Sequence, residues 1–301
     1  EIFTSYVLVY QFDYGFPGLG ISRGFSELGR AIVLIYCLSK HDTFKETFFW
    51  LEKNSFDGLW KQIKYQFFTG MVSYIEYFAF LCGEMVTAYL GVKEFDASFS
   101  YVTIMMFIIQ IPISVQQPAG SYISNAVGEG SLRKTEIYIK AANLFMFGMC
   151  VICALASGLL SSPLSGLFLD DPEIKETTRR LLLQYMFCLI TDVGQMHFAI
   201  ILRSLGKETI AFKIMFLTDF VIGIPLECVG GILLNGGALG TWLGLQVGYF
   251  LNFCFQLREL LRTDIPTAIK EVQKHLNDID YMIDSPDKPA KTADIELRDI
   301  Q

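Results

Sequence analysis

The sequence predicts an all-α protein with several transmembrane helices, and three observations point to this fold class. Of the 301 residues, 52% are hydrophobic and only 18% are charged, whereas soluble domains usually contain about 45–50% apolar and about 25% charged residues. The apolar residues form long runs separated by short polar segments. The net charge of −7 provides no positive field for phosphate backbones, which argues against a nucleic-acid partner.

Seven apolar runs are long enough to cross a bilayer, whose hydrocarbon core of about 30 Å requires about 20 helical residues. They occupy residues 19–38, 65–91, 99–124, 137–162, 181–202, 209–233 and 238–257. A shorter run at residues 2–10 precedes them. Because the chain opens on Glu1 and lacks the basic segment of a signal peptide, we interpret this run as the truncated end of an eighth helix and the chain as a fragment.

Charge and composition divide the predicted chain into four parts. Lysine and arginine gather in alternate loops and at the end of the last span, so the positive-inside rule places those loops and the C terminus in the cytosol. The tail carries nine acids and five bases, and apart from an amphipathic stretch around residues 269–276 its composition predicts disorder. The parts are a truncated helix pair at 1–38, a cytosolic linker at 39–64, a six-helix lobe at 65–263 and the acidic cytosolic tail at 264–301.

All seven cysteines lie inside apolar runs, where they are expected to pack as small side chains rather than to form disulfides. Cys150 and Cys153 form a C-x-x-C pair, but their neighbours are apolar. A zinc or redox site usually has polar surroundings, so the sequence predicts no metal and no cofactor.

Three carboxylates, Glu76, Asp192 and Asp219, lie near the centres of predicted spans, and Glu84 and Glu227 lie further from such centres. A charge at mid-bilayer costs about 2.5–3.5 kcal/mol on insertion scales, so such residues face a cavity or a partner. Burial disfavours the charged form, which allows these acids to bind and release protons. An organic cation would compete with the proton for the same carboxylate.

The alternative for each acid is a neutral or paired structural role. It is weakest for Glu76 and Asp192, whose neighbours at or near helical spacing are aromatic or polar. Tyr77 and Phe80 lie close to Glu76, and Gln195 follows Asp192 by three residues. These neighbours favour a binding site for a cation or proton.

Prolines interrupt two of the predicted spans. Pro112 and Pro118 lie in one span and Pro225 follows Gly223 in another. A proline inside a helix removes a backbone hydrogen bond and kinks the helix. Transporters use such helices to line their cavities, so the three prolines are candidate kink or gating positions.

Two further features can each be interpreted in two ways. His197 lies in the same span as Asp192 but on a different face, and it is either a proton relay or a packing residue. Arg23, Glu27 and Arg30 follow one another at helical spacing. Such a ladder neutralises itself along one helix face, which is favoured here over an anion site.

Four motifs appear in a fixed order along the chain. Residues 111–130 align without gaps to I-P-x-G-x-S-x-A-A-S-x-R-V-x-N-x-L-G-A-G, and residues 201–206 look like V-x-R-G-x-G. Residues 221–225 look like V-G-I-P, and residues 236–244 look like G-G-x-G-x-W-x-G. This order resembles eukaryotic members of the multidrug and toxic compound extrusion (MATE) family. The resemblance implies a twelve-helix transporter of which this chain contains the end of the N-terminal lobe and the whole C-terminal lobe.

The resemblance also selects site residues. It implies that Glu76, followed by Tyr77 and a phenylalanine, corresponds to the E-W-W of the family's seventh helix, whose Glu is a proposed coupling and substrate residue. Asp192 falls where eukaryotic members carry Asp or Glu in the tenth helix, and Gln195 matches a Gln of plant-type members. Asp219 departs from the pattern, because it stands where the family often has Tyr.

The other departures concern the number of acids. Leu81 stands where a second Glu is often found in the seventh helix, and Thr103 stands where some animal members have Glu. Compared with those members, this chain has fewer acids at the expected positions, which leaves stoichiometry and substrate charge open.

We therefore predict a membrane antiporter, not an enzyme, that exports organic cations or xenobiotics in exchange for protons by alternating access. Glu76 and Asp192 are expected to bind cation or proton in turn, with Tyr77, Gln195 and Asp219 completing the site. Na⁺ is an alternative coupling ion, and no cofactor is expected. The expected partners are small organic cations and membrane lipids, and the expected state is a monomer in the plasma membrane or a vacuolar or vesicular membrane.

Three alternatives remain at this point. A lipid or lipid-linked sugar flippase of the same superfamily would favour basic groups, for which Arg23 and Arg30 give weak support. A seven-helix receptor would match the number of complete spans but would need extracellular disulfides. An intramembrane enzyme could use Asp192 and Asp219 as an aspartyl pair, although the Gly-rich aspartyl signature is missing.

Overall fold

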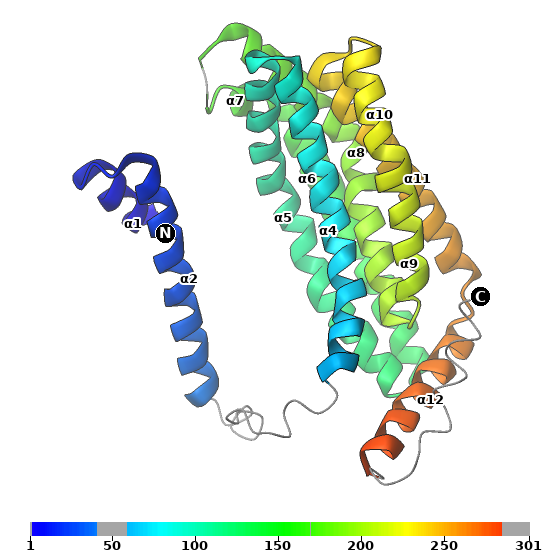
Figure 1. Cartoon of the computed structure of the whole chain (residues 1–301). Helices are drawn as coiled ribbons and strands as arrows, with labels where there is room; N and C mark the ends of the chain where they lie inside the picture. Colours follow the sequence, from blue (N-terminus) through cyan, green and yellow to red (C-terminus); the bar gives the residue numbers. More distant parts are fainter. Residues whose placement is uncertain (1, 41–58, 169, 285–301) are drawn as a thin grey trace. The chain divides into compact units, whose positions relative to one another are not determined.

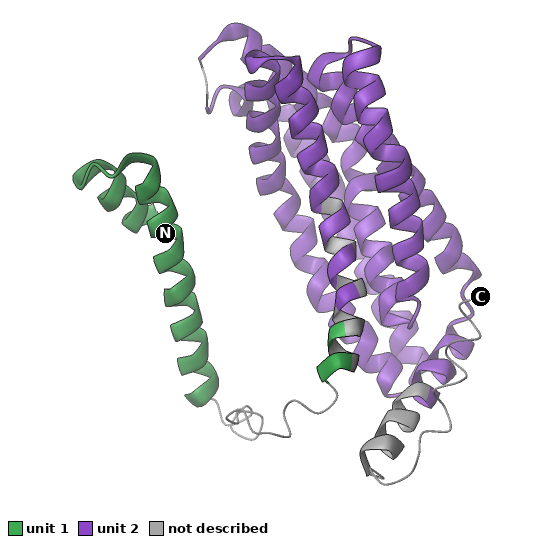
Figure 2. Ribbon diagram, viewed as in Figure 1, with its two compact units in different colours: residues 1–63 green, residues 64–301 purple. Residues whose placement is uncertain are grey.

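The computed structural model describes residues 2–40, 59–168 and 170–284, and within residues 61–76 and 275–284 it leaves several side chains, including that of Glu76, undescribed. All regular elements in these ranges are helices (Figure 1), which confirms the predicted all-α class. The chain divides into two compact units, residues 1–63 and residues 64–301 (Figure 2). Each unit is described by itself.

The first unit contains a short helical hairpin. It consists of α1 (Ile2–Tyr6), the π-helical turn η1 (Val7–Gln11) and the long helix α2 (Gly15–Lys40). The hydroxyl groups of Thr4 and Ser5 each lie 2.8 Å from that of Ser22 and join α1 to α2. Arg30 forms a 3.2 Å ion pair with Glu27, so part of the predicted charge ladder is present.

The second unit is a bundle of long helices (Figure 1). Its elements are α4 (Leu59–Leu90), of which residues 59–63 fall in the first unit, α5 (Val92–Gly128), α6 (Leu132–Leu159), α7 (Ser161–Ser165), α8 (Pro172–Ser204), α9 (Glu208–Met215), η3 (Phe216–Gly223), α10 (Ile224–Cys228), η4 (Val229–Leu233), α11 (Gly237–Arg262) and α12 (Ile265–Asp284). Apart from Gly91 and Leu160, all residues of the seven predicted spans are helical. Among the described residues, four helical stretches are long and apolar enough to cross a membrane: α5, α6, α8 and the continuous run 208–233.

The prolines have different effects on their helices. Pro112 and Pro118 lie inside α5, which continues through both. Pro225 lies in the first turn of α10, between the π-helical segments η3 and η4. The run 208–233 therefore stays helical but changes its hydrogen-bond register on either side of Pro225.

Close packing holds α11 against this run of changing register. Gly240, Gly244 and Gly248 follow one another at four-residue spacing on α11. A Cβ atom on Gly244 would lie 2.3 Å from the carbonyl oxygen of Leu226, and one on Gly240 would lie 2.2 Å from that of Gly230. Small residues at such spacing let helix backbones approach closely in membranes.

An aromatic cluster fills the centre of the bundle. Trp242, Tyr101 and Tyr185 are fully buried, and Tyr101 meets the other two rings edge-on with centroid distances of 5.3 and 5.9 Å. Phe80 of α4 lies 5.7 Å from the Trp242 ring. Aromatic contacts therefore connect α4, α5, α8 and α11 around the site described below.

The segment after the last span differs from its prediction. The sequence predicts disorder there apart from residues 269–276, whereas α12 is helical from Ile265 to Asp284. Ala268 and Ile269 are buried in a cluster with residues of α5 and α6. This contact gives the start of α12 an apolar surface to pack on, and residues 285–301 lie outside the described part.

Candidate functional site

Two of the predicted acids, Asp192 and Asp219, are buried inside the second unit. Asp192 of α8 is 2% exposed and Asp219 of η3 is 0% exposed. Both therefore lie in an environment where a carboxyl group requires hydrogen-bond partners. The packed helices supply these partners.

Asn252 of α11 connects Asp219 with Gln195. Its side-chain nitrogen donates to both carboxyl oxygens of Asp219 at 3.0 Å and to Oε1 of Gln195 at 2.9 Å. Gln256, one turn further along α11, donates to Oδ1 of Asn252 at 2.6 Å. The amide of Asn252 has two hydrogens for three acceptors, so its hydrogen bonds are shared between α8 and η3.

Asp192 has a separate donor. The hydroxyl of Tyr185, seven residues earlier on α8, donates to Oδ2 of Asp192 at 2.9 Å. Tyr185 is fixed by its contact with the ring of Tyr101, and Gln116 of α5 binds the backbone carbonyl of Val193 at 3.0 Å. The part of α8 that carries Asp192 is thus held against α5 at two places, through Tyr185 and at Val193.

The hydroxyl of Thr218 suits Asp219 in two protonation states. Its oxygen lies 2.9 Å from the carbonyl oxygen of Ile214 and 2.9 Å from Oδ1 of Asp219. A hydroxyl has one hydrogen and can also accept. It can donate a hydrogen bond to a charged Asp219. Alternatively, it can donate to the Ile214 carbonyl and accept a hydrogen bond from a neutral Asp219, without a change in the positions of the heavy atoms.

The structure brings together Asp219 and Gln195 from the predicted site, with Asp192 three residues before Gln195 on α8. Glu76 lies in α4, but its side chain is outside the described part. Tyr77 is 67% exposed on the same helix and is not among the described hydrogen-bond partners of Asp219.

Three polar residues of the site escaped the sequence analysis: Tyr185, Asn252 and Gln256. The predicted site consisted of acids and residues near them in the sequence. Asn252 and Gln256 were detectable as polar residues one turn apart inside the last apolar span, residues 238–257. Uncharged polar residues in an apolar helix are a weaker signal than acids, because they are cheaper to bury.

His197 faces another part of the bundle. Its Nε2 lies 2.8 Å from Oδ1 of Asn143 on α6, and its ring meets Phe147 edge-on with a centroid distance of 6.5 Å. This position favours the packing interpretation over the proton relay.

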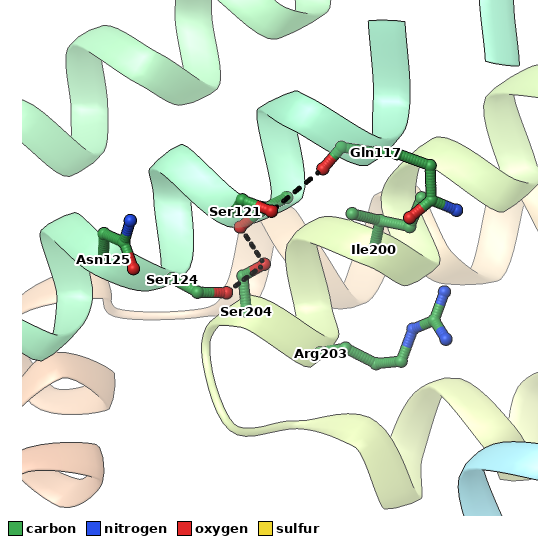
Figure 3. Close-up of a pocket in the computed structure, with 8 residues that line it drawn as sticks. Gln117, Ser121, Ser124, Asn125, Ile200, Arg203 and Ser204 are labelled. Carbon is green, nitrogen blue, oxygen red and sulfur yellow. Dashed lines mark hydrogen bonds between the residues drawn. The ribbon is translucent and has the colours of Figure 1, made fainter. Parts of the chain in front are cut away.

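A polar pocket of about 490 Å³ lies between α5 and α8 (Figure 3). Its lining residues are Gln117, Gly120, Ser121, Ser124, Asn125, Ile200, Arg203 and Ser204. The hydroxyl of Ser124 donates to that of Ser204 at 3.1 Å, and Ser204 donates to the carbonyl of Gly120 at 3.2 Å. None of the predicted site residues lines this pocket.

The charged residues do not form a metal centre in the described ranges. No group of three or more His, Cys, Asp or Glu side chains is gathered there in a way that could hold a metal ion. Cys150 and Cys153 are buried and unbridged.

These features define a class of protein: a helical membrane protein with buried carboxyl groups between its spans. Its family follows from comparison with known proteins, because the MatE family model matches residues 69–229, which is more than half of the chain. The chain belongs to the MatE family, as its motifs indicated.

The curated relatives are distant in sequence and longer than this chain. Multidrug and toxin extrusion protein 2 of Oryctolagus cuniculus is 21% identical over 201 residues, which are 67% of this chain and 33% of that protein. Multidrug and toxin extrusion protein 1 of Xenopus tropicalis is 22% identical over 273 residues, 89% of this chain and 47% of that protein. The chain therefore spans half or less of the length of these two relatives.

Solved structures share the fold. A crystal structure of the eukaryotic MATE transporter AtDTX14 matches with a TM-score of 0.82 at 16% identity, over 91% of this chain and 62% of that one. An outward-facing MATE family transporter of the MOP superfamily matches with a TM-score of 0.71 at 17% identity, over 90% and 60%. At these identities the matches show a common helical arrangement.

Proposed function

We propose that this chain forms part of a secondary active transporter that exports organic cations or xenobiotics in exchange for protons. The observation that carries the proposal is the Asp219 network, in which the Thr218 hydroxyl and the Asn252 amide provide partners for an acid with or without its proton. The relatives are named for multidrug and toxin extrusion, which supports the substrate class.

Antiport follows from competition at a buried acid. A carboxyl group between packed helices is charged only when a cation or a donor compensates it. Proton binding displaces a cationic substrate, and substrate binding displaces the proton. A lobe that alternates between two membrane faces would then exchange one for the other.

Several features of the transporter belong to this proposal. Glu76 and Asp192 act as the coupling and substrate carboxyls, aromatic side chains such as Tyr77 contact the cation, and Pro112, Pro118 and Pro225 are positions at which the helices bend. Na⁺ is the alternative coupling ion. The protein is a monomer in the plasma membrane or a vacuolar or vesicular membrane, and its C terminus lies in the cytosol.

The buried groups favour a cationic substrate over the lipid phosphate of a flippase. The charged residues inside the described bundle next to Gln195 and Asn252 are carboxylates, which repel phosphate. Arg203 lies in the separate pocket.

The test is uptake of a fluorescent organic cation into vesicles that contain the full-length protein, driven by a pH gradient. Asp192→Asn and Glu76→Gln are expected to reduce the initial rate at least tenfold. Glu136→Gln is the matched control, because Glu136 is a half-exposed acid of α6 that pairs with Lys140 at 3.8 Å. Unchanged transport in both site variants would refute the assignment of these residues, and uptake that ignores the pH gradient would refute proton antiport.

A further inference from the structure

Glu227 is a third buried carboxyl group, and it is separate from the Asp192 and Asp219 sites. It lies in α10 and is 0% exposed. Neither of its carboxyl oxygens has a hydrogen-bond partner among the described residues. Asp192 and Asp219, in contrast, each accept a hydrogen bond from a buried hydroxyl.

The surroundings of Glu227 are small or apolar. Gly83 of α4 lies against its carboxyl end, because a Cβ atom on Gly83 would be 3.2 Å from Oε1 of Glu227 and 3.6 Å from Cη2 of Trp242. On the other side, a Cβ atom on Gly244 would be 2.6 Å from the backbone nitrogen of Glu227. The carboxyl group thus lies against Gly83 of α4, next to the Trp242 ring, while the backbone of Glu227 packs against Gly244 of α11.

The ionisable groups near this position carry no positive charge. Cys82 on α4 lies close enough to Glu227 for an electrostatic interaction, Glu84 is two residues further along the same helix, and Cys228 follows Glu227 in α10. Glu94 of α5 is bound to the backbone N–H of Ala238 at the start of α11. Among the described residues, Glu227 has no ion-pair partner to balance a negative charge.

This environment selects a proton as the ligand. A metal cation such as Ca²⁺ or Mg²⁺ requires about six or more oxygen ligands, and one carboxyl group beside an indole ring does not provide them. A proton requires a single lone pair. Since an isolated charged carboxylate in an apolar environment is strongly disfavoured, Glu227 is suited to hold a proton in the state that the structure describes.

The helix that carries Glu227 offers a way to release the proton. α10 has five residues and lies between the π-helical segments η3 and η4. Each π-helical turn holds one residue more than an α-helical turn, so its conversion would rotate the following residues by roughly 100°. Such a rotation would carry the side chain of Glu227 away from Gly83 and toward a different neighbour.

We propose that Glu227 is an additional proton-binding site, loaded when α10 packs against Gly83 and emptied when α10 rotates or α4 moves away. As a coupling site it rests on the proposed antiport, to which it would add one exchanged proton per transport cycle. Its assignment as a proton-binding group does not depend on antiport, because it is argued from the burial of Glu227 and its lack of a hydrogen-bond partner among the described residues.

Infrared difference spectroscopy of the full-length protein in lipid vesicles, recorded between acidic and alkaline pH, tests proton binding directly. A protonated carboxyl group gives a C=O band that shifts in D₂O. We expect one such band to be lost in Glu227→Gln and retained in Glu84→Gln. Retention of every band in Glu227→Gln would overturn the proposal.

Two glycine variants test the location without removing the acid. Gly83→Ala places a methyl group against Oε1, so the Glu227 band should move in frequency but persist. Gly70→Ala is the matched control on α4, because a Cβ atom there would have no neighbour within 4 Å, and its spectrum should equal that of the wild type. A Glu227 band unaffected by Gly83→Ala would contradict the assigned environment.

The coupling role is tested by the number of protons that move per substrate in the same vesicles. Glu227→Gln is expected to lower this number by one, and an unchanged number would overturn the coupling role. If the wild-type protein transports the cation without moving protons, the proposed antiport and the coupling role both fail. The infrared band still decides whether Glu227 binds a proton.

Discussion

Asn252 binds both carboxyl oxygens of Asp219 at 3.0 Å, and this contact joins α11 to the π-helical segment η3. It is the connection through which α11, which has no acid within the predicted span 238–257, participates in the candidate site. Because Asn252 also donates to Gln195, the same amide connects Asp219 to α8, the helix that carries Asp192.

Asn252→Ala is expected to destabilise the protein by about 1–3 kcal/mol, because it leaves buried polar groups without a partner. Thermal unfolding in detergent measures this loss. Asp219→Leu in the Asn252→Ala background should recover part of it, since the unpaired carboxyl is then gone. Asn125→Ala is the control, because Asn125 is exposed in the pocket of Figure 3, and it should change stability by less than about 0.5 kcal/mol. Equal losses in the two alanine variants would contradict the network.

Tyr185→Phe reports the charge of Asp192. The substitution removes only the hydroxyl that donates to Oδ2. A hydrogen bond to a charged group is worth about 1.5–3 kcal/mol and one to a neutral group about 0.5–1.5 kcal/mol. We expect the smaller loss at acidic pH and the larger loss at alkaline pH, measured as unfolding free energies of variant and wild type.

Tyr101→Phe is the comparison for this variant. Tyr101 is buried in the same aromatic cluster, but its hydroxyl only accepts a long contact of 3.5 Å from Gln246. Its substitution should therefore have a small effect at every pH. The absence of a pH-dependent loss in Tyr185→Phe would show that Asp192 keeps one charge state over the range studied. A pH-dependent loss in Tyr101→Phe would show that the dependence does not come from the Tyr185–Asp192 hydrogen bond.

Asp171 caps the start of α8, outside the predicted span. The sign of its effect on the stability of this helix end as the pH changes can be derived. Its carboxylate accepts from the backbone N–H groups of Glu173 and Ile174 at 2.8 and 3.3 Å, and these bonds hold its pKa below the ordinary value. Because the pKa of Asp171 is lowered in the folded state, its stabilising contribution is fully present above the pKa of the unfolded state. This contribution is lost as the pH falls through the pKa of the folded state.

Amide hydrogen exchange at Glu173 and Ile174 measures this cap. Protection should fall as the pH is lowered below about 4, the ordinary range of an aspartate, after correction for the intrinsic pH dependence of exchange. Asp171→Asn should flatten this dependence, because asparagine caps helices at any pH. The exposed neighbour Asp170 binds Lys175 rather than the backbone, so Asp170→Asn should leave the profile unchanged. If the pH dependence of amide protection is unchanged in Asp171→Asn, another group is responsible for it.

The sequence predicts the helices of this protein well for a simple reason. Apolar runs of about 20 residues can satisfy their backbone in lipid only as helices. The seven predicted spans accordingly lie almost entirely in helices, and in the described part of the chain four helical stretches are long and apolar enough to cross a membrane. Asp192 and Asp219 stood out because acids are costly there. The partners of these acids depend on packing between distant segments: Asn252 meets Asp219 only because α11 lies against η3, and no spacing rule connects the two.

Two other features depend on tertiary structure in the same way. The π-helical turns around Pro225 reflect how η3 and η4 pack on the glycines of α11, which local sequence does not determine. The start of α12 is stabilised by the burial of Ala268 and Ile269 against residues of α5 and α6. Composition alone favoured a disordered tail there, since it counts acids and prolines but not available surface.

Gly244→Ala tests the close packing of α11 against α10, the short helix between the π-helical segments η3 and η4. A methyl group at Gly244 would meet the carbonyl oxygen of Leu226 at 2.3 Å, and because this contact is backbone on backbone it cannot be relieved by a side-chain rotation. Overpacking of this kind typically costs about 1–3 kcal/mol, seen as a lower unfolding temperature in detergent. At Gly148 of α6 a Cβ atom would have no neighbour within 4 Å, so Gly148→Ala should be neutral or stabilising by up to about 1 kcal/mol. If Gly244→Ala behaves like Gly148→Ala, α11 and α10 are not in backbone contact.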